Sequence, residues 1–294
     1  MFEYATTIDR TGLYDGQSEE AIIDRYKRNY QIDTVSFAQV RRHAELEGQL
    51  TDQILASQRG DRAAVASHAY STLYREIDWL TGTGGPPDGE RWLALLHKGA
   101  DVYEVGSGAG KLAQFLNDHG VNCVRTDISN ERNSANQLDG SRTTDGVNLS
   151  DFVDRTYDYV ISDQVAEHLH PADIIPHFTE AHKILATGGS YIFRAPNVHC
   201  GPHDLSLVFD LDKPVFMHLH EFEWRDVDLI VDQCGFADAK AIFTVPGTQI
   251  AIPSGLYFSY LKFVEKTFGG RKNFKRLAKA LYFPTQVWVK LSKA

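Results

Sequence analysis

The chain has little cysteine and no long apolar run. Its three cysteines, Cys123, Cys200 and Cys234, are odd in number and far apart, so neither a disulfide framework nor a zinc pattern is indicated. No run approaches the ~18 apolar residues of a membrane span. The N-terminus also lacks the pattern of a signal peptide. We therefore expect a cytoplasmic protein, and the 294 residues with 43% hydrophobic content suffice for a full α/β core.

The most informative segment is glycine-rich. Three alternate glycines follow a short apolar run that contains an acid, and a helical pattern begins at once: Glu104, then Gly106, Gly108 and Gly110. The backbone must turn tightly there. The third glycine of a dinucleotide fingerprint would fall at Lys111, and Leu112 stands where a P-loop requires Ser or Thr. Phosphate is therefore not the expected ligand.

Acid, any residue, then three alternating glycines after a strand resembles the cofactor loop of class I S-adenosylmethionine-dependent methyltransferases. A helical pattern from Leu112 to His119 follows, and residues 121–126 predict a second strand that ends in Asp127. The resemblance implies that the Asp127 carboxylate accepts hydrogen bonds from a ribose diol.

Downstream segments narrow the resemblance. A strand runs into Asp163-Gln164 and Glu167-His168-Leu169, and a helical stripe from Ile174 to Leu185, Gly188-Gly189 and a strand ending at Pro196 come next. The segment His218 to Phe222 precedes another helical pattern at 226–234. This order resembles the branch that includes ubiquinone-biosynthesis O-methyltransferases and sugar or secondary-metabolite methyltransferases. The resemblance covers residues 91–245 and a final strand at 286–291.

The resemblance implies a fold and a set of contacts. The fold is α/β, with a doubly wound, mostly parallel seven-stranded sheet, an N-terminal helical region and a helical insertion before the last strand. The cofactor is S-adenosyl-L-methionine, and its implied contacts are Glu104, Gly106, Ser107, Gly108, Gly110, Asp127, Ile128, Asp145, Gly146, Asp163 and Gln164. An ordinary turn explains Asp145 equally well.

Histidines supply the candidate bases. Methyl transfer is an in-line displacement, so alignment gives much of the acceleration, and a hydroxyl acceptor still gains from a base. Eight of the twelve histidines lie between residues 168 and 220, and His168 and His199 each follow the end of a predicted strand, where ligands bind in such sheets. We take these two as candidates, although any single histidine of this group is more often structural.

A metal is not predicted. Some ubiquinone-pathway relatives hold a divalent ion with a Glu, two residues, then Glu-His. In this chain Gln164 occupies the first position, and an amide is a poorer ligand for a hard cation than a carboxylate.

The two ends of the chain differ in character. Residues 1–90 predict a helical cap closed by a Gly- and Pro-rich loop at 81–89. In the resembled enzymes such helices cover the cofactor and shape the acceptor pocket; the alternative is an appendage that adds stability or a homodimer contact. Residues 91–294 form the methyltransferase domain, with a basic amphipathic insertion at 246–284.

Positive charge is concentrated near the C-terminus. From Lys262 to Ala294 there are nine Lys or Arg and one acid. Basic amphipathic helices with aromatic residues can lie in an anionic membrane interface, which predicts a peripheral membrane contact through 257–283. The alternative is an ordinary helix pair packed on the domain.

The predicted function is S-adenosylmethionine-dependent methylation of a hydroxyl on a small-molecule, glycan or lipid-linked acceptor. A nucleic acid is disfavoured, because base-modifying enzymes carry Asn or Asp, Pro, Pro and an aromatic residue where this chain has residues 162–165 as Ser-Asp-Gln-Val. The net charge of -9 also repels phosphates. A non-catalytic scaffold with the same fold and an RNA methyltransferase that uses the basic tail are the alternatives.

Overall fold

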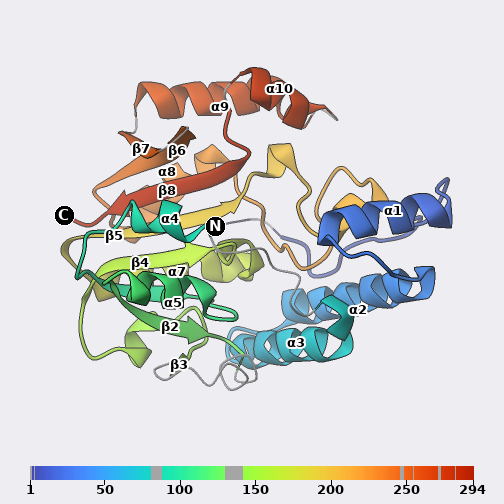
Figure 1. Ribbon diagram of the computed structural model, residues 1–294, viewed down its shortest axis with the longest axis horizontal. Coiled ribbons are helices and arrows are strands. Elements are labelled where there is room, and N and C mark those ends of the chain that lie inside the picture. The colour runs from blue at the N-terminus through green and yellow to red at the C-terminus, as the bar shows by residue number, and fades with distance from the viewer. Residues whose placement is uncertain are drawn as a thin grey trace.

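A computed structural model gives the structure of residues 2, 4–80, 88–129, 142–245, 248–253, 255–270, 273–281 and 283–294. Within these residues the sheet has eight strands in the order β3-β2-β1-β4-β5-β8-β6-β7 (Figure 1). The strands are β1 Asp101–Val105, β2 Asn122–Asp127, β3 Arg142–Thr143, β4 Tyr157–Asp163, β5 Leu185–Pro196, β6 Asp238–Val245, β7 Thr248–Pro253 and β8 Gln286–Ser292.

The sheet is mostly parallel. Neighbouring strands from β3 to β5 pair in parallel, whereas β8 runs antiparallel to both β5 and β6, and β7 runs antiparallel to β6. The predicted α/β fold is therefore confirmed. The strand order changes direction between β1 and β4, and ligands bind at such switch points in open α/β sheets.

The eighth strand, β7, departs from the predicted helical insertion at 246–284. It pairs antiparallel with β6, so the two strands form a hairpin at the edge of the sheet. The helices of this region begin only at α9 (Leu256–Phe268) and α10 (Phe274–Ala280).

Helices cover both faces of the sheet. Side chains alternate along each strand, so Ile161 and Ile192 join one core with α4 (Gly89–Leu93) and α5 (Lys111–Asp118). Val160, Tyr191 and Phe193 face the other core, where they pack with four further helices: α7 (Ile174–Ile184), α8 (Trp224–Cys234), α9 and α10.

Three N-terminal helices lie at the carboxyl edge of the sheet (Figure 1). They are α1 (Glu19–Tyr30), α2 (Phe37–Ala56) and α3 (Arg62–Glu76). Ser36 and Gln39 form a capping box that starts α2. The Ser67 hydroxyl on α3 donates to the Ile128 carbonyl at 2.9 Å, just beyond β2. These helices are thus packed over the place where a ligand is expected.

Short helical turns complete the described structure: η1 Asp78–Leu80, η2 Leu149–Phe152, η3 Ala166–His168, η4 Pro171–Asp173, η5 Val198–Cys200 and η6 Leu205–Phe209. Residues 81–87 of the predicted loop lie outside the described residues. No described helix combines the length and the apolar character needed to cross a membrane.

Candidate functional site

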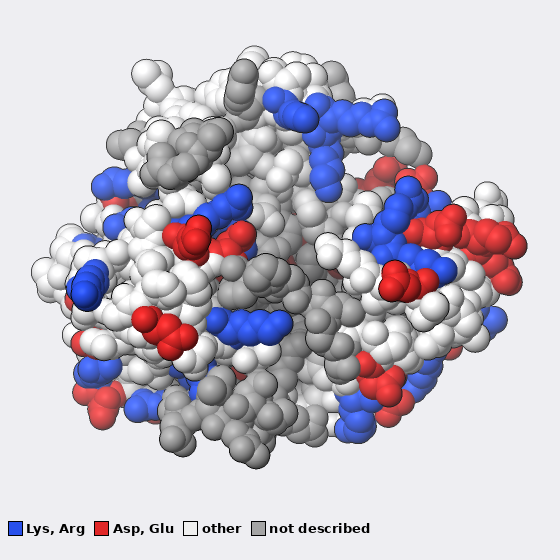
Figure 2. All heavy atoms as spheres, viewed as in Figure 1, with Lys and Arg blue, Asp and Glu red and all other residues white. Residues whose placement is uncertain are grey.

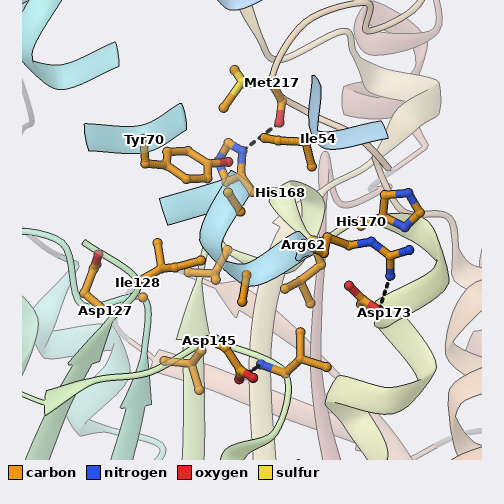
Figure 3. Close-up of a pocket in the computed structure, with 18 of the residues that line it drawn as sticks. Ile54, Arg62, Tyr70, Asp127, Ile128, Asp145, His168, His170, Asp173 and Met217 are labelled. Carbon is orange, nitrogen blue, oxygen red and sulfur yellow. Dashed lines mark hydrogen bonds and ion pairs between the residues drawn. The ribbon is translucent and has the colours of Figure 1, made fainter. Parts of the chain in front are cut away.

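A cavity of about 240 Å³ opens at the carboxyl ends of β1, β2 and β4, beneath α2 and α3 (Figure 3). Seven of the site residues predicted from the sequence line it: Gly106, Asp127, Ile128, Asp145, Gly146, Gln164 and His168. Three separate segments that follow β1, β2 and β4 therefore converge on one space, together with Asp145 and Gly146 after β3.

The glycine loop turns in the left-handed region. Gly106, Gly108 and Gly110 have φ angles of 67°, 53° and 71°. A Cβ on Gly106 would meet Val165 Cγ2 at 2.5 Å, and a Cβ on Gly110 would meet the Arg125 guanidinium. The backbone angle therefore favours glycine at both positions, and at Gly106 the Val165 side chain also leaves no room for a Cβ.

Asp127 is fixed at the rim of the cavity. The Gly108 amide donates to its Oδ2 at 2.8 Å, and the Ser129 amide donates to its Oδ1 at 2.9 Å. Each carboxylate oxygen can accept a further hydrogen bond. The arrangement fits a ribose diol, as the sequence predicts.

Asp145 has a local structural role in addition to lining the cavity. Its Oδ1 accepts hydrogen bonds from the amides of Val147 at 2.8 Å and Asn148 at 2.7 Å. These hydrogen bonds form the ordinary turn that the sequence analysis gave as the alternative explanation for Asp145. The turn presents the neighbouring backbone to the cavity.

Five predicted cofactor contacts are described but do not line the cavity: Glu104, Ser107, Gly108, Gly110 and Asp163. Asp163 is held by Arg194 through two hydrogen bonds of 2.7 Å and accepts one from the Trp92 indole at 3.2 Å. Glu104 is 4% exposed, and burial, with the nearby charge of Asp163, raises its pKa to about 8. Asp163 is thus held by the protein's own side chains and Glu104 is buried, and a cofactor contact of either acid stays a prediction.

Gln164 follows Asp163 into the cavity with a strained backbone. Its φ of 56° is uncommon for a residue other than glycine, and such strain often marks functional sites. Its amide donates to the Arg194 carbonyl at 2.9 Å, which holds the turn.

The orientation of His168 is set by a backbone carbonyl. Its Nδ1 lies 2.9 Å from the Met217 carbonyl, and because a carbonyl can only accept, Nδ1 carries the hydrogen and Nε2 is the basic nitrogen. The ring meets Tyr70 edge-on with centroids 5.8 Å apart (Figure 3).

His199, the other candidate base, does not line this cavity. Its Nε2 lies 3.0 Å from Glu223 Oε2, and a Cβ on Gly269 at the end of α9 would meet its Nδ1 at 2.6 Å. Burial lowers the pKa of His199, but the hydrogen bond to Glu223 and the charge of Glu265 raise it above the usual value. His199 is therefore part of the packing between the sheet and the C-terminal helices.

A buried charged cluster adjoins His168. One ligand atom each of Glu167, His168 and His218 lies within 4.8 Å of the others, a grouping that could hold a metal ion. His218 Nδ1 lies 2.9 Å from Glu221 Oε1. Burial lowers the pKa of His218, but Glu221 and Glu167 raise it to about 9. A protonated His218 thus already supplies a positive charge between the two acids.

Sequence motifs did not reveal the residues that close the cavity. Glu47 comes from α2, and Arg62 and Tyr70 come from α3. Arg62 Nη1 lies 2.5 Å from Asp173 Oδ1, an ion pair that joins α3 to η4. Helical periodicity alone was the available signal, and it does not say which turn of a helix meets the sheet.

Comparisons with known proteins agree with this geometry. Residues 103–193 match a family model described as "Methyltransferase domain". A search of curated proteins found no match. The chain is similar in structure to a "SAM-dependent methyltransferase, possible histamine N-methyltransferase" from Thermotoga maritima, with 14% identity over 78% of this chain and 100% of that chain and a TM-score of 0.50.

Two further structures show lower similarity. A SAM-dependent methyltransferase from Archaeoglobus fulgidus has 16% identity, a TM-score of 0.46, and coverage of 78% of this chain and 94% of that chain. An S-adenosylmethionine-dependent methyltransferase from Mesorhizobium loti has 17% identity, a TM-score of 0.45, and coverage of 71% and 100%.

The match over residues 103–193, together with the mostly parallel sheet and the cavity at its switch point, supports an S-adenosylmethionine-dependent methyltransferase. Its cofactor is S-adenosyl-L-methionine, and the enzyme class and cofactor predicted from the sequence are confirmed. The narrower branch suggested by the sequence remains a prediction.

Proposed function

We propose that the protein transfers a methyl group to a hydroxyl of a small-molecule, sugar or lipid-linked acceptor. The supporting observation is His168, which lines the same cavity as Asp127 and has its basic nitrogen set by the Met217 carbonyl. The order of motifs around Glu167-His168-Leu169, which resembles the O-methyltransferase branch, supports the same choice.

S-adenosylmethionine, when bound, supplies an electrophilic methyl group on a sulfonium. Gly106, Asp127, Asp145 and Gln164 would hold it. His168 Nε2 would accept the proton of the acceptor hydroxyl as its oxygen forms the new bond to carbon. The helices α2 and α3 above the cavity would exclude water and align the acceptor, which is the larger share of the acceleration.

The test compares the two candidate bases. A panel of hydroxyl acceptors is screened by release of S-adenosylhomocysteine, and mass spectrometry locates the new methyl group. We expect His168→Gln to lower kcat about 100-fold while S-adenosylhomocysteine still binds. His199→Gln should change kcat by less than about threefold, because this ring lies outside the cavity. A methyl group found on nitrogen or carbon, or a fully active His168→Gln variant, would contradict the proposal.

We also propose a peripheral contact with anionic lipid, carried by α9. The apolar residues of α10 are used within the protein: Phe274 and Ala278 are buried in the core. On α9, by contrast, Leu256, Tyr260 and Phe263 are spaced four and three apart and are 93%, 37% and 61% exposed. This stripe is the apolar surface available to lipid.

Positive charge accompanies the stripe. Lys and Arg side chains gather over α10, as Figure 2 shows, and Lys266, Lys275, Arg276 and Lys279 are exposed. Exposed apolar side chains beside several cations suit an anionic bilayer surface. Arg271 and Lys272, which the sequence adds to this charge, lie outside the described residues.

A further inference from the structure

A chain of buried hydrogen bonds leads through the N-terminal helices to the cavity. The Trp79 indole lies 3.2 Å from the Tyr26 oxygen, the Tyr26 hydroxyl 2.9 Å from His43 Nδ1, and His43 Nε2 2.8 Å from Glu47 Oε1. An indole can only donate and a carboxylate can only accept, so Trp79 donates to Tyr26 and His43 Nε2 donates to Glu47; with a neutral His43 ring, the Tyr26 hydroxyl donates to Nδ1. Tyr26 is 0% and His43 2% exposed. The carboxylate of Glu47 is therefore held in one orientation.

The second oxygen of this carboxylate has no protein partner. Glu47 lines the cavity, and its side chain is 9% exposed. Its Oε2 is buried and accepts no hydrogen bond from any residue that the structure describes. The Tyr70 hydroxyl, which also belongs to a residue of the cavity wall, is likewise buried and has no hydrogen-bond partner among the described residues. A buried carboxylate oxygen without a donor is costly, so a bound ligand is the natural source of one.

The charges around the cavity indicate which donor fits. Among the described residues that line the cavity, Asp173 forms an ion pair with Arg62. The carboxylates of Asp127 and Asp145 accept hydrogen bonds from backbone amides. Arg62 is the only Lys or Arg in this lining. Glu47, on α2, has no Lys or Arg partner among these residues, and its contact with His43, 2.8 Å from Nε2 to Oε1, leaves Oε2 without a donor. A cationic donor would be bound more strongly there than a neutral one, because charge-assisted hydrogen bonds are roughly twice as strong.

We propose that Glu47 binds a protonated amine of the methyl acceptor. This inference rests on the proposed function, since it takes the space near His168 as the acceptor's place. The ammonium group donates to Glu47 Oε2, and a second polar atom of the acceptor is within reach of the Tyr70 hydroxyl. The acceptor is then an amine-bearing compound whose methylated atom lies at His168.

The test uses two probes of similar shape. Tyramine carries an ammonium group at the end of its ethyl chain, whereas 4-propylphenol ends in a methyl group and is uncharged. Each is titrated by calorimetry into the protein saturated with S-adenosylhomocysteine. We expect tyramine to bind at least about tenfold more tightly than 4-propylphenol.

Two variants of α2 make the test specific. Glu47→Gln keeps an oxygen for His43 but removes the charge, and it should abolish the preference for tyramine. Glu45→Gln removes an equal charge from the outer face of α2, where Glu45 is 51% exposed and pairs with Arg41, and the preference should persist. The affinity for S-adenosylhomocysteine should stay within about twofold in both variants, and thermal melting reports whether each is folded.

Several outcomes would overturn the inference. These are equal binding of the two probes, no binding of tyramine, tyramine that displaces S-adenosylhomocysteine, or a preference that survives in Glu47→Gln. A variant that fails to fold is replaced by Glu47→Asp, which should weaken tyramine binding because the shorter carboxylate withdraws from the cavity. The test measures binding, so a negative result would contradict the amine contact but not the proposed methylation of a hydroxyl. Conversely, methylation at another atom would leave the amine contact intact.

Discussion

Arg194 and Asp163 form a two-pronged ion pair across β4 and β5, with both N to O distances at 2.7 Å. The same guanidinium reaches Asp88 at 2.5 Å and lies over the Trp288 ring at 5.1 Å. The pair fixes the end of β4 directly before the strained Gln164. Asp163, a predicted cofactor contact, is thus also an anchor for the strand that shapes the cavity.

Replacing Arg194 should destabilise the protein and weaken cofactor binding together. Arg194→Met leaves Asp163 without its cation beside buried Glu104, and we expect a loss of about 3 kcal/mol in the free energy of unfolding. Arg91→Met is the matched control, since Arg91 also contacts Asp88 but is 48% exposed, and it should cost less than about 0.5 kcal/mol. Urea denaturation measures both, and equal stability of the two variants would refute the structural role.

Gly106→Ala should impair the cofactor loop more than backbone strain alone can explain. The added methyl would meet Val165 Cγ2 at 2.5 Å, whereas at Gly188, which has a φ of 76°, a Cβ meets nothing within 4 Å. We expect Gly188→Ala to cost about 1 kcal/mol and leave S-adenosylhomocysteine binding unchanged. Gly106→Ala should weaken that binding about tenfold or more, and adding Val165→Ala should restore part of it. Calorimetry decides, and equal effects at the two glycines would count against the clash.

The sequence predicted those parts of the site that follow directly from strand ends. Gly106, Asp127 and His168 belong to local motifs, and their positions depend on the order of strands alone. The ion pair of Asp163 with Arg194 was not predictable from local motifs, because the two residues lie 31 positions apart, on neighbouring strands.

The cavity roof could not be predicted in the same way. Glu47 and Tyr70 reach the cavity only through the packing of α2 and α3 on the sheet edge, which no local pattern encodes. β7 carries no polar and apolar alternation either, because two polar residues precede four apolar residues in Thr248–Pro253, so its sequence did not distinguish it from the helices that follow.

The His218–Glu221 pair should make stability depend on alkaline pH. The neighbouring carboxylates raise the folded pKa of His218 to about 9 from its ordinary value of 6.5, so its contribution is complete below pH 6.5 and is lost as the pH rises through 9. The pKa of Glu221 is lowered to about 2, so its contribution is lost only as the pH falls from 4.5 through 2. The stability advantage of the wild type over His218→Gln should therefore be larger at pH 6 than at pH 9.5, by an amount on the order of 2 kcal/mol. Denaturation at both pH values measures it, and a constant difference would show that His218 does not titrate in this range.

Chelation should leave methyl transfer intact. Gln164 replaces one anionic ligand of the resembled metal site, and its side-chain amide lies 3.4 Å from the Arg194 carbonyl. The Glu221 and Glu167 carboxylates raise the pKa of His218 to about 9, so a metal ion would have to displace a proton to bind there. The rate of S-adenosylhomocysteine release is measured before and after treatment with a chelator. An inactive chelated enzyme that magnesium restores would overturn this prediction.

Lipid binding should depend on the outer stripe of α9. The protein is expected to float with vesicles that contain phosphatidylserine and to bind neutral phosphatidylcholine vesicles less, because exposed cations accompany the apolar side chains. The double variant Leu256→Ser and Phe263→Ser should lower binding at least about tenfold, since each inserted side chain contributes about 1.5–3 kcal/mol when fully buried. Leu207→Ser is the control, because Leu207 is 38% exposed on η6 and lies outside the stripe. Charge reversal at Lys275 and Lys279 should lower binding to the anionic vesicles only. If the wild-type protein binds neither vesicle, or if Leu207→Ser lowers binding as much as the double variant, α9 is not a lipid-contacting element.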